Sequence, residues 1–555
     1  MKSSKFIGLA GTQLSESEGD NVEHSMKSVE PSTHLRSCAN NRPPGGASET
    51  VRFRRSLLVQ LISLFALLTM PLGLVAQDNG MQNHKPKHHT YKLIDVGRFG
   101  GPNSVLYGVN SGGTVIGVAE TSVTDPFSPN CFTPFSDCLV VHASEWRNGI
   151  STDLGALPGV NGSFAFGINN LGGITGVSEN GLIDPLTGFP EVIAVYWKDG
   201  KIIDLGTFGG NASYANAINN AGQIVGMASN TIPDNYSTGI GLPYFVSAFP
   251  VTTQFRAFLW QHGAMQDLGT LGGNSAQAVF VNDRGQVVGV SYTNTVADPS
   301  TTFPTQDPFF WENGKMTDIG SLGGASGYPA WINNRGQVVG ASDLGGYNAD
   351  GTLIYHGFFW DKKDGLKDIG TLGGTLSFLN SVNDNGEAVG ASSLAGDQVN
   401  HALLWKNGNV TDLGVPPGME SSEALSINAK GQIVGNTGNR FGSVGPSTGW
   451  LWENGGPMVD LNQLIVPSSD ITVTVAEYIN DRGEIACTGV TPNGDTRGVI
   501  LIPDGDCDDT CEARIAESQN KPGPAQVNSA TKIGTPAIHG RFARRFPPPK
   551  TGPNN

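Results

Sequence analysis

The chain has 555 residues, including 76 glycines, and its formal net charge at pH 7 is −15 although only 15% of its residues are charged. This acidic balance argues against general nucleic-acid binding, which requires a basic surface. Six cysteines are few for a chain of this length.

The N-terminal part predicts export. Residues 51–76 have the pattern of a signal peptide: basic residues first, then an apolar run at 56–70, then Leu74-Val75-Ala76 before a cleavage site. We therefore expect a secreted protein, periplasmic or extracellular, with no transmembrane domain in the mature chain. An uncleaved anchor is the alternative, although the apolar run is short for a membrane span. Residues 1–50 are a polar extension that is either disordered or the result of a misplaced start, and residues 77–90 are a linker.

A phrase of three parts then recurs along the chain. Asp-Leu-Gly-x-Leu-Gly-Gly is followed by Ile-Asn-x-x-Gly-Gln-Val-Val-Gly and by an aliphatic-Trp-x-x-Gly segment. The copies begin at Asp95, Asp153, Asp204, Asp267, Asp318, Asp368, Asp412 and, in degenerate form, Asp460. A glycine-rich period near fifty residues is typical of a repeat architecture.

Each repeat predicts four antiparallel strands. In the clearest copy the apolar runs are 275–282, 286–291, 308–311 and 315–319, and each is bounded by Gly, Asn or Asp. The turns Asn-Asp-x-Gly and Asn-Gly suit the left-handed backbone angles of tight hairpins. A β-propeller accommodates blades of forty to fifty residues with variable loops better than a β-solenoid does.

The strand count predicts how the propeller closes. The repeats begin with a fourth strand, residues 91–96, and end with a third strand, 498–502. If the first strand of the chain completes the last blade, the ring has no exposed edge. We therefore predict an all-β propeller of eight blades over residues 91–503, with seven blades as the alternative.

Five repeats predict a pair between a basic residue that opens the third strand and an Asp of the fourth strand. The pairs are His142 with Asp153, Arg256 with Asp267, His356 with Asp368, His401 with Asp412, and, through ring closure, Arg497 with Asp95. Ile193, Asp307 and Thr448 hold the basic position in the other repeats. We interpret the pairs as structural clamps of a charge-assisted kind; a His/Asp site repeated around the ring is the alternative.

The sequence also makes predictions about the cysteines and the C-terminus. Cys131 with Cys138, and Cys507 with Cys511, are spaced for local disulfides in an exported protein. Cys487 replaces a glycine of the second strand and is expected to be a buried free thiol. Residues 504–555 show no strand pattern and end in a basic stretch, so we expect a disordered tail.

These phrases resemble the bacterial "extracellular repeat, HAF family". His401-Ala402-Leu403 and Arg256-Ala257-Phe258 are variants of its His-Ala-Phe triplet. The resemblance covers about 91–503 and implies a secreted repeat protein. It brings no established activity and no catalytic residues.

Three functions remain open. Insertions concentrate between the second and third strands, which favours a binding module that recognises a glycan or an envelope protein on one face of a monomeric propeller. A glycan hydrolase or lyase is the first alternative, and a structural surface or matrix protein is the second. The acids that an enzyme could use are Asp125, Glu179, Asp184, Glu191, Asp234 and Asp298. No catalytic motif, metal-ligand cluster or cofactor motif is present, so we predict none of these sites.

Overall fold

The fold is described from a computed structural model, which describes residues 88–128, 131–159, 161–240, 252–348, 351–437, 447–453 and 455–519. Two units, 1–81 and 82–555, divide the chain, and the described residues belong to the second. The predicted extension 1–50, the signal peptide 51–76 and most of the 77–90 linker lie outside the described residues.

Strands make up more than half of the described residues. The first sheets contain β2 (Gly100–Val109), β3 (Val115–Thr124), β4 (Leu139–Arg147) and β5 (Ile150–Asp153); β6 (Ser163–Ile168), β7 (Ile174–Ile183), β8 (Pro190–Lys198) and β9 (Lys201–Asp204); β10 (Gly209–Ile218), β11 (Ile224–Pro233), β12 (Thr253–Gln261) and β13 (Ala264–Asp267), with the 3-10 helix η1 (Ser237–Gly239). Next come β14 (Ala276–Val281), β15 (Val287–Ala297), β16 (Pro304–Glu312) and β17 (Lys315–Asp318); β18 (Gly327–Ile332), β19 (Val338–Tyr347), β20 (Leu353–Asp361) and β21 (Gly365–Asp368).

The remaining sheets follow the same order. They contain β22 (Gly373–Val382), β23 (Ala388–Leu394), β24 (Asn400–Lys406) and β25 (Asn409–Gly414); β26 (Glu423–Ile427), β27 (Ile433–Asn436), β28 (Gly449–Trp452) and β29 (Val459–Asp460), then η2 (Leu461–Gln463); and β30 (Thr472–Ile479), β31 (Ile485–Val490) and β32 (Thr496–Asp506) with β1 (His89–Asp95). Helix α1 (Asp509–Gln519) follows β32. The all-β prediction is confirmed, and the four-stranded antiparallel sheets are those of a propeller-like fold.

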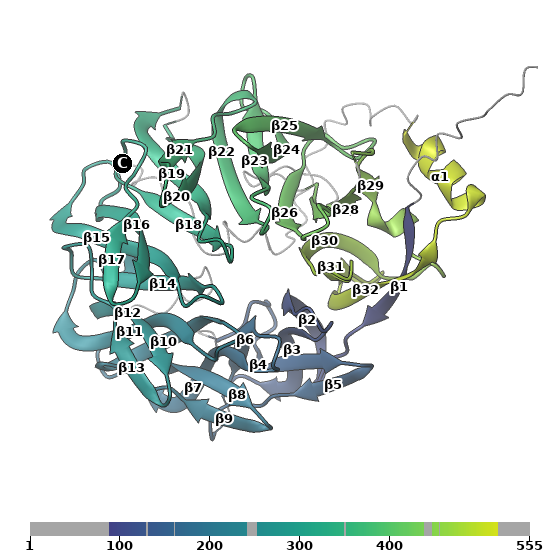
Figure 1. The fold of residues 1–555 in the computed structure, drawn as a ribbon. Coiled ribbons are helices and arrows are strands. Elements are labelled where there is room, and N and C mark those ends of the chain that lie inside the picture. The colour runs from purple at the N-terminus through teal and green to yellow at the C-terminus, as the bar shows by residue number, and fades with distance from the viewer. Residues whose placement is uncertain are drawn as a thin grey trace, which may run out of the picture. The chain divides into compact units, whose positions relative to one another are not determined.

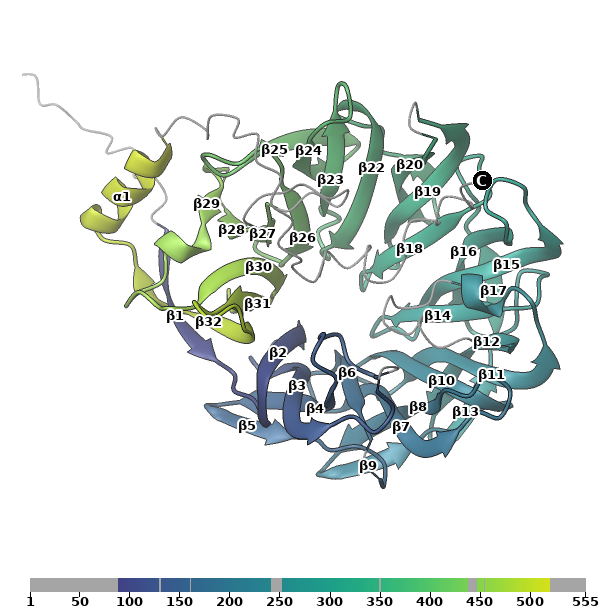
Figure 2. The same ribbon diagram turned by 180° about the vertical axis from the view of Figure 1, so that it is seen from behind.

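The last sheet takes its fourth strand from the opposite end of the chain. β1 pairs with β32 antiparallel, with Asp95 opposite Val499 and Tyr91 opposite Pro503. Both views place β1 beside β32 (Figures 1 and 2). This is the pairing that the sequence predicts. Elsewhere the strands of a sheet are consecutive in the chain, and a single parallel bridge between Ala212 and Val192 joins two sheets.

Each sheet has two unlike ends, which we name by their connections. At the turn end, short turns join the first strand to the second and the third to the fourth, as at 282–286 and 313–314. At the hairpin end, the second strand joins the third, as at 297–304, and a link such as 319–326 leads to the next sheet. Asn313 and Gly314 at the turn end have φ of 52° and 80°, as expected for a hairpin turn that needs left-handed residues.

The repeated glycine of the second strand is explained by a close backbone approach. A Cβ atom on Gly289 would lie 2.0 Å from the carbonyl oxygen of Gln277 on the first strand, and one on Gly176 would lie 1.8 Å from that of Phe164. Any side chain there would displace the first strand. The last sheet has Cys487 at this position, and its thiol is buried and free, as predicted.

The core lies between successive sheets. Phe258, Phe309 and Phe358 occupy equivalent places on third strands and are fully buried. The cluster that contains Phe309 also includes buried residues from the sheets before and after it, such as Val225 and Val338. A four-stranded sheet therefore buries its faces only against its neighbours, which is the reason that the repeats must stack.

Eight buried asparagines link the sheets at the turn end. Each opens the turn between first and second strands, and its Nδ2 donates to the main-chain carbonyl of the equivalent asparagine in the next sheet. The donors in order are Asn110, Asn169, Asn219, Asn282, Asn333, Asn383, Asn428 and Asn480, with N–O distances of 2.8–3.1 Å. The last donor, Asn480, bonds to the carbonyl of the first, Asn110, so the circuit returns to its start.

The same asparagines also form their own turns. Asn282 Oδ1 accepts hydrogen bonds from the main-chain N–H groups of Arg284 and Gln286, each at 3.0 Å. Gly285 within this turn has a φ of 74°. The prediction that these asparagines form turns is therefore right. It is incomplete, because the Nδ2 group of each asparagine also bonds to the next sheet.

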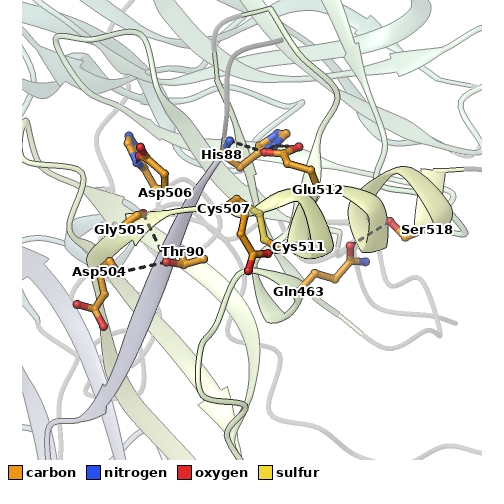
Figure 3. Close-up of a disulfide and its surroundings, with 12 residues drawn as sticks. His88, Thr90, Gln463, Asp504, Gly505, Asp506, Cys507, Cys511, Glu512 and Ser518 are labelled. Carbon is orange, nitrogen blue, oxygen red and sulfur yellow. Dashed lines mark hydrogen bonds and ion pairs between the residues drawn. A yellow bond between two sulfur atoms is a disulfide. The ribbon is translucent and has the colours of Figure 1, made fainter. Parts of the chain in front are cut away.

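The start of the C-terminal tail is ordered, which corrects one prediction. β32 continues to Asp506, α1 occupies 509–519, and Figure 3 shows α1 tied to its neighbours by the Cys507–Cys511 disulfide and a Ser518–Gln463 hydrogen bond. Both cysteines and Ile515 are buried against the last sheet. Residues 520–555 lie outside the described residues.

The local sequence explains why this helix begins where it does. The Asp508 carboxylate accepts the N–H of Cys511 at 2.9 Å, which is an N-cap contact. His88 Nδ1 lies 3.2 Å from Glu512 Oε1, so the residue before β1 is tied to the helix after β32. β1 itself begins at His89, two residues earlier than the predicted strand, which shortens the 77–90 linker.

Candidate functional site

The predicted basic–acidic pairs all lie at the hairpin end. The Nδ1–Oδ distances are 2.9 Å for His142–Asp153, 2.8 Å for His356–Asp368 and 2.9 Å for His401–Asp412. The Nε–Oδ2 distances are 2.9 Å for Arg256–Asp267 and 3.5 Å for Arg497–Asp95. Leu403 lies opposite Asp412, which is the register used to predict these pairs.

The Asp of each pair also holds the link to the next sheet. Asp153 Oδ1 accepts the N–H of Gly155 at 2.7 Å, and Asp368 accepts that of Gly370 at the same distance. Burial acts to raise the pKa of Asp153 and Asp368, but the hydrogen bonds from the paired histidine and the glycine N–H act against it, and the net pKa is lowered. These contacts fit a clamp that fixes the fourth strand and the link.

The three departures from the pair have different consequences. Thr448 Oγ1 donates to Asp460 at 2.9 Å, which replaces the ion pair with a neutral hydrogen bond. Asp307 instead faces a like charge: burial and then the charge of Asp318 raise the pKa of Asp307 to about 6. Ile193 offers no polar partner to the Asp204 carboxylate, which accepts the N–H of Gly206.

Two of the predicted enzyme acids are buried and accept hydrogen bonds from neighbouring groups instead of facing solvent. The Asp125 carboxylate is buried and accepts the N–H groups of Phe127 and Phe132. Asp234 is buried and accepts the Ser275 hydroxyl at 2.8 Å. These carboxylates therefore fix the shape of the hairpin end. Asp184, Glu191 and Asp298 are partly exposed there.

Two glutamates at the hairpin end are buried with one oxygen bonded to backbone. Glu120 Oε2 accepts the N–H of Asn103 at 2.8 Å, and Glu179 Oε2 accepts that of Gly162 at 2.6 Å. Burial, followed by a hydrogen bond with Asp137, raises the pKa of Glu120 to about 8. Burial raises the pKa of Glu179 to about 7. Both side chains are shielded from solvent, so they brace the first-strand backbone.

The aromatic residues of the first long hairpin are part of the core. Phe132 and Phe135 are buried, and the Phe132 ring lies 4.7 Å from that of Phe164. The disulfide between Cys131 and Cys138 closes this hairpin.

Most of the exposed large apolar residues of the described chain lie at the hairpin end, although Ile150 and Leu171 are exposed at the turn end. This bias is a feature that sequence reasoning missed. Large apolar side chains are exposed on the hairpins of five consecutive sheets: Val123, Leu182, Ile183, Leu186, Ile232, Val296 and Tyr347. The signal that could have found them is the occurrence of aliphatic residues inside otherwise polar hairpins.

A small hollow lies beside one of these residues, Leu186. It has a volume of about 170 Å³ and lies among the hairpin after β7, the start of β10 and the end of β11. Asp184 and Leu186 line one side of it, and Asn211, Asn230 and Thr253 line the other. Asn211 Nδ2 donates to Asp184 Oδ1 at 3.1 Å, which fixes two of the polar groups. The hollow offers hydroxyl, amide and carboxylate groups next to an exposed leucine.

The described part of the chain has neither a cluster of metal ligands nor a helix that could span a membrane. No group of three or more His, Cys, Asp or Glu side chains there could hold a metal ion. In the same residues, no helix has the length and apolar character needed to cross a membrane.

Comparison with known proteins places the chain in no family. No family model matches it, and no curated protein matches its sequence. Among solved structures, it is similar to the Pyrococcus horikoshii acylaminoacyl peptidase, with 11% identity and a TM-score of 0.34 over 70% of this chain and 57% of that one. TolB from Acinetobacter baumannii gives 11% identity and a TM-score of 0.26, over 71% of this chain and 80% of TolB. The polysaccharide lyase Uly1 gives 10% and 0.30, over 77% and 95%.

The chain spans a little over half the length of the peptidase that it resembles. At these identities and TM-scores the likenesses assign no activity to it.

Proposed function

We propose that this protein is an exported binding module, a closed eight-bladed propeller that holds its ligand at the hairpin end. The observation that carries the proposal is the set of exposed apolar side chains on consecutive hairpins, one of which, Leu186, lines the hollow at Asp184 and Asn211. Apolar side chains that stay exposed on neighbouring segments of one face are a feature of interaction sites. The combination suits a glycan or an envelope protein.

Contacts between the last and first sheets support closure and the count of eight, with seven blades as the alternative. Asn480 donates to the carbonyl of Asn110. The N–H of Thr496 donates to Asn103 Oδ1 at 2.9 Å, and that of Gly498 donates to Ser104 Oγ at 3.1 Å. Closure would leave no sheet edge open to another chain.

Export and family membership are part of the same proposal. The signal-peptide pattern of 51–76 supports secretion to the periplasm or outside the cell, and the variant His-Ala-Phe triplets support a protein of the HAF repeat type. N-terminal sequencing of the exported chain should give Gln77 as the first residue. An intact Arg52 in the exported protein would contradict the cleavage.

The binding proposal is tested with a glycan array and a panel of envelope proteins, probed with residues 77–555 purified from an exporting host. We expect selective binding that is lost on Leu186→Glu, because this leucine is 68% exposed at the rim of the hollow. The matched control is Leu171→Glu, at a leucine that is 74% exposed at the turn end. Equal loss of binding in both variants would contradict recognition at the hairpin end.

The same samples test the alternatives. Release of shortened glycans from the array would favour a hydrolase or lyase. Light scattering of the free protein should give a monomer, whereas regular self-association would favour a structural matrix protein.

A further inference from the structure

The apolar side chains of the hairpin end lie among carboxylates. The partly or fully exposed acids of the hairpins are Asp137, Asp184, Glu191, Asp298, Asp307 and Asp397. Asp204 and Asp318, at the ends of their fourth strands, are exposed and have no cationic partner among the described residues. The hairpin end therefore combines apolar contacts with negative charge.

Cations are absent from these hairpins over the residues that the structure describes. The sequence places one, Arg440, in a hairpin, and it lies outside the described residues. The turn end carries most of the lysines and arginines, namely Arg147, Lys198, Lys201, Arg284, Lys315, Arg335, Lys362, Lys363, Lys406, Lys430 and Arg482. Acids offset these cations at the turn end, where Lys362, Lys406 and Arg482 pair with Glu312, Glu387 and Glu484. At the hairpin end the cations are Arg98, Arg256 and Arg497, and the last two already face Asp267 and Asp95, so the described hairpins themselves keep a negative balance.

The C-terminal segment of the chain has the complementary chemistry. From 520 to 555 it contains six basic residues and no acidic one. Its Arg541-Phe542-Ala543-Arg544-Arg545-Phe546 stretch alternates guanidinium groups with aromatic rings. Arginine binds carboxylates in bidentate geometry and phenylalanine fills apolar surface, so one short segment matches both features of the hairpin end.

The C-terminal segment starts from a fixed point, helix α1, and is long enough to reach the hairpin end. Helix α1 is held by the disulfide, by Ser518–Gln463 and by Gln519, whose Nε2 donates to the Met458 carbonyl at 3.1 Å (Figure 3 shows the first two contacts). Twenty-one residues separate Gln519 from Arg541. At about 3.3 Å per residue they span roughly 70 Å when extended. A ten-residue strand, the distance from one end of a sheet to the other, spans about 33 Å.

We propose that residues 541–550 dock on the hairpin end of their own chain and occupy it until an external ligand displaces them. This inference rests on the proposed function of the hairpin end. It adds a regulator, a basic aromatic segment, to the same surface.

The test is zero-length cross-linking of the full exported chain with a carbodiimide, which joins a lysine amine to a carboxylate. We expect Lys550 to link to Asp184, Glu191 or Asp298. The yield should fall about tenfold in 1 M salt, where the screening length is about 3 Å. Links from Lys550 to turn-end acids such as Asp199 in equal yield would overturn the proposal.

Charge-reversal variants separate a loss of docking from a loss of folding. Arg541→Glu, Arg544→Glu and Arg545→Glu together should abolish the links without changing the melting temperature, because these residues lie beyond α1. The control reverses three turn-end charges, Lys315, Lys363 and Lys430, to Glu and should keep the links. A mixture of isotope-labelled and unlabelled chains shows whether the link is within one chain; links between chains would contradict docking on the same copy.

The two proposals can fail separately. Equal array binding by the wild-type chain and the Arg541, Arg544 and Arg545 variant would contradict docking of the segment and leave the binding module intact. Hairpin-end cross-links in the wild-type chain, together with an empty glycan array for the Arg541, Arg544 and Arg545 variant, would support docking and contradict a glycan ligand.

Discussion

The two ends of the sheets differ in how strictly their residues repeat. At the turn end, the same asparagine makes the same bond to the next sheet in every copy, from Asn110 to Asn480. At the hairpin end, hairpin lengths and side chains vary, although two contacts repeat there in most sheets. One is the Asp that holds the link, and the other is a first-strand serine hydroxyl that accepts an N–H from the preceding sheet, as Ser163 does from Ala143 and Ser377 does from Gly357. A uniform network is what a scaffold requires, whereas variation on a rigid frame is what recognition requires. Predictions that separate the ends therefore test the division of roles.

The largest effect is expected at the strand that closes the last sheet. Tyr91 on β1 is fully buried in a cluster with Val499 and Leu501. Tyr91→Ala should lower the free energy of unfolding by about 3–5 kcal/mol, because it removes a large buried ring and leaves a cavity. Denaturant titration measures the change. Tyr91→Phe is the matched control and should cost under about 1 kcal/mol, since the ring is kept. A cost under about 1 kcal/mol for the alanine variant would mean that β1 does not help to hold the fold.

The next largest effect on the free energy of unfolding is expected when an asparagine of the turn end is replaced, and an asparagine near the hairpin end serves as the comparison. Asn282→Ala should cost about 2–3 kcal/mol, because the carbonyl of Asn333 and the turn N–H groups of Arg284 and Gln286 lose their partner in a buried place. Asn294, near the hairpin end, is only partly buried and accepts one N–H, from Val296. Asn294→Ala should cost about 0.5 kcal/mol. Equal costs would contradict the scaffold role of the turn end.

A third prediction concerns pH at the hairpin end. The pKa of Glu120 in the folded chain, about 8, is above its ordinary value of 4.5. Its stabilising contribution is therefore complete below pH 4.5 and is lost as the pH rises through about 8. Relative to the wild type, Glu120→Gln should gain about 1–2 kcal/mol between pH 5 and pH 9. Melting curves at the two pH values measure this gain. A flat difference for Glu120→Gln would mean that this carboxyl ionises freely.

The smallest effect is expected at the exposed pairs. His356→Ala should cost less than about 1 kcal/mol at pH 7, since the Asp368 side chain is 40% exposed. The pKa of Asp368 is lowered, so the contribution of the pair is present above the ordinary carboxyl pKa and is lost as the pH falls through the lowered value. Unfolding titrations at pH 7 and pH 3 should therefore show a smaller cost at the lower pH. A cost above about 2 kcal/mol would assign these pairs to the scaffold.

Local rules account for much of what could be predicted. Asn-x-x-Gly and Asn-Gly turns define the strands from residues that are neighbours in the chain, and the diagonal register of His401 and Asp412 follows from one hairpin. The pairing of β1 with β32 followed from counting strands, because a missing fourth strand at one terminus matched an extra one at the other.

The contacts that sequence reasoning missed are between sheets or depend on a few residues. The bond from Asn282 to Asn333 joins turns of different sheets, so no local pattern reveals it. Helix α1 buries only Cys511 and Ile515, which is too short an apolar pattern to predict a helix, although the Asp508 cap is visible in the sequence. Exposure of Leu186 depends on where its hairpin lies and not on its neighbours in the chain.

Hydrogen exchange measured by mass spectrometry on the full chain tests the contrast most directly. The account predicts that peptides covering β1 exchange as slowly as those covering β31 and β32, and that the turns from Asn110 to Asn480 are similarly protected. Peptides from the hairpins, such as 293–303, should exchange within the shortest labelling times. Fast exchange of β1 on its own, or hairpins as protected as the turns, would contradict the proposed closed scaffold and its proposed recognition end.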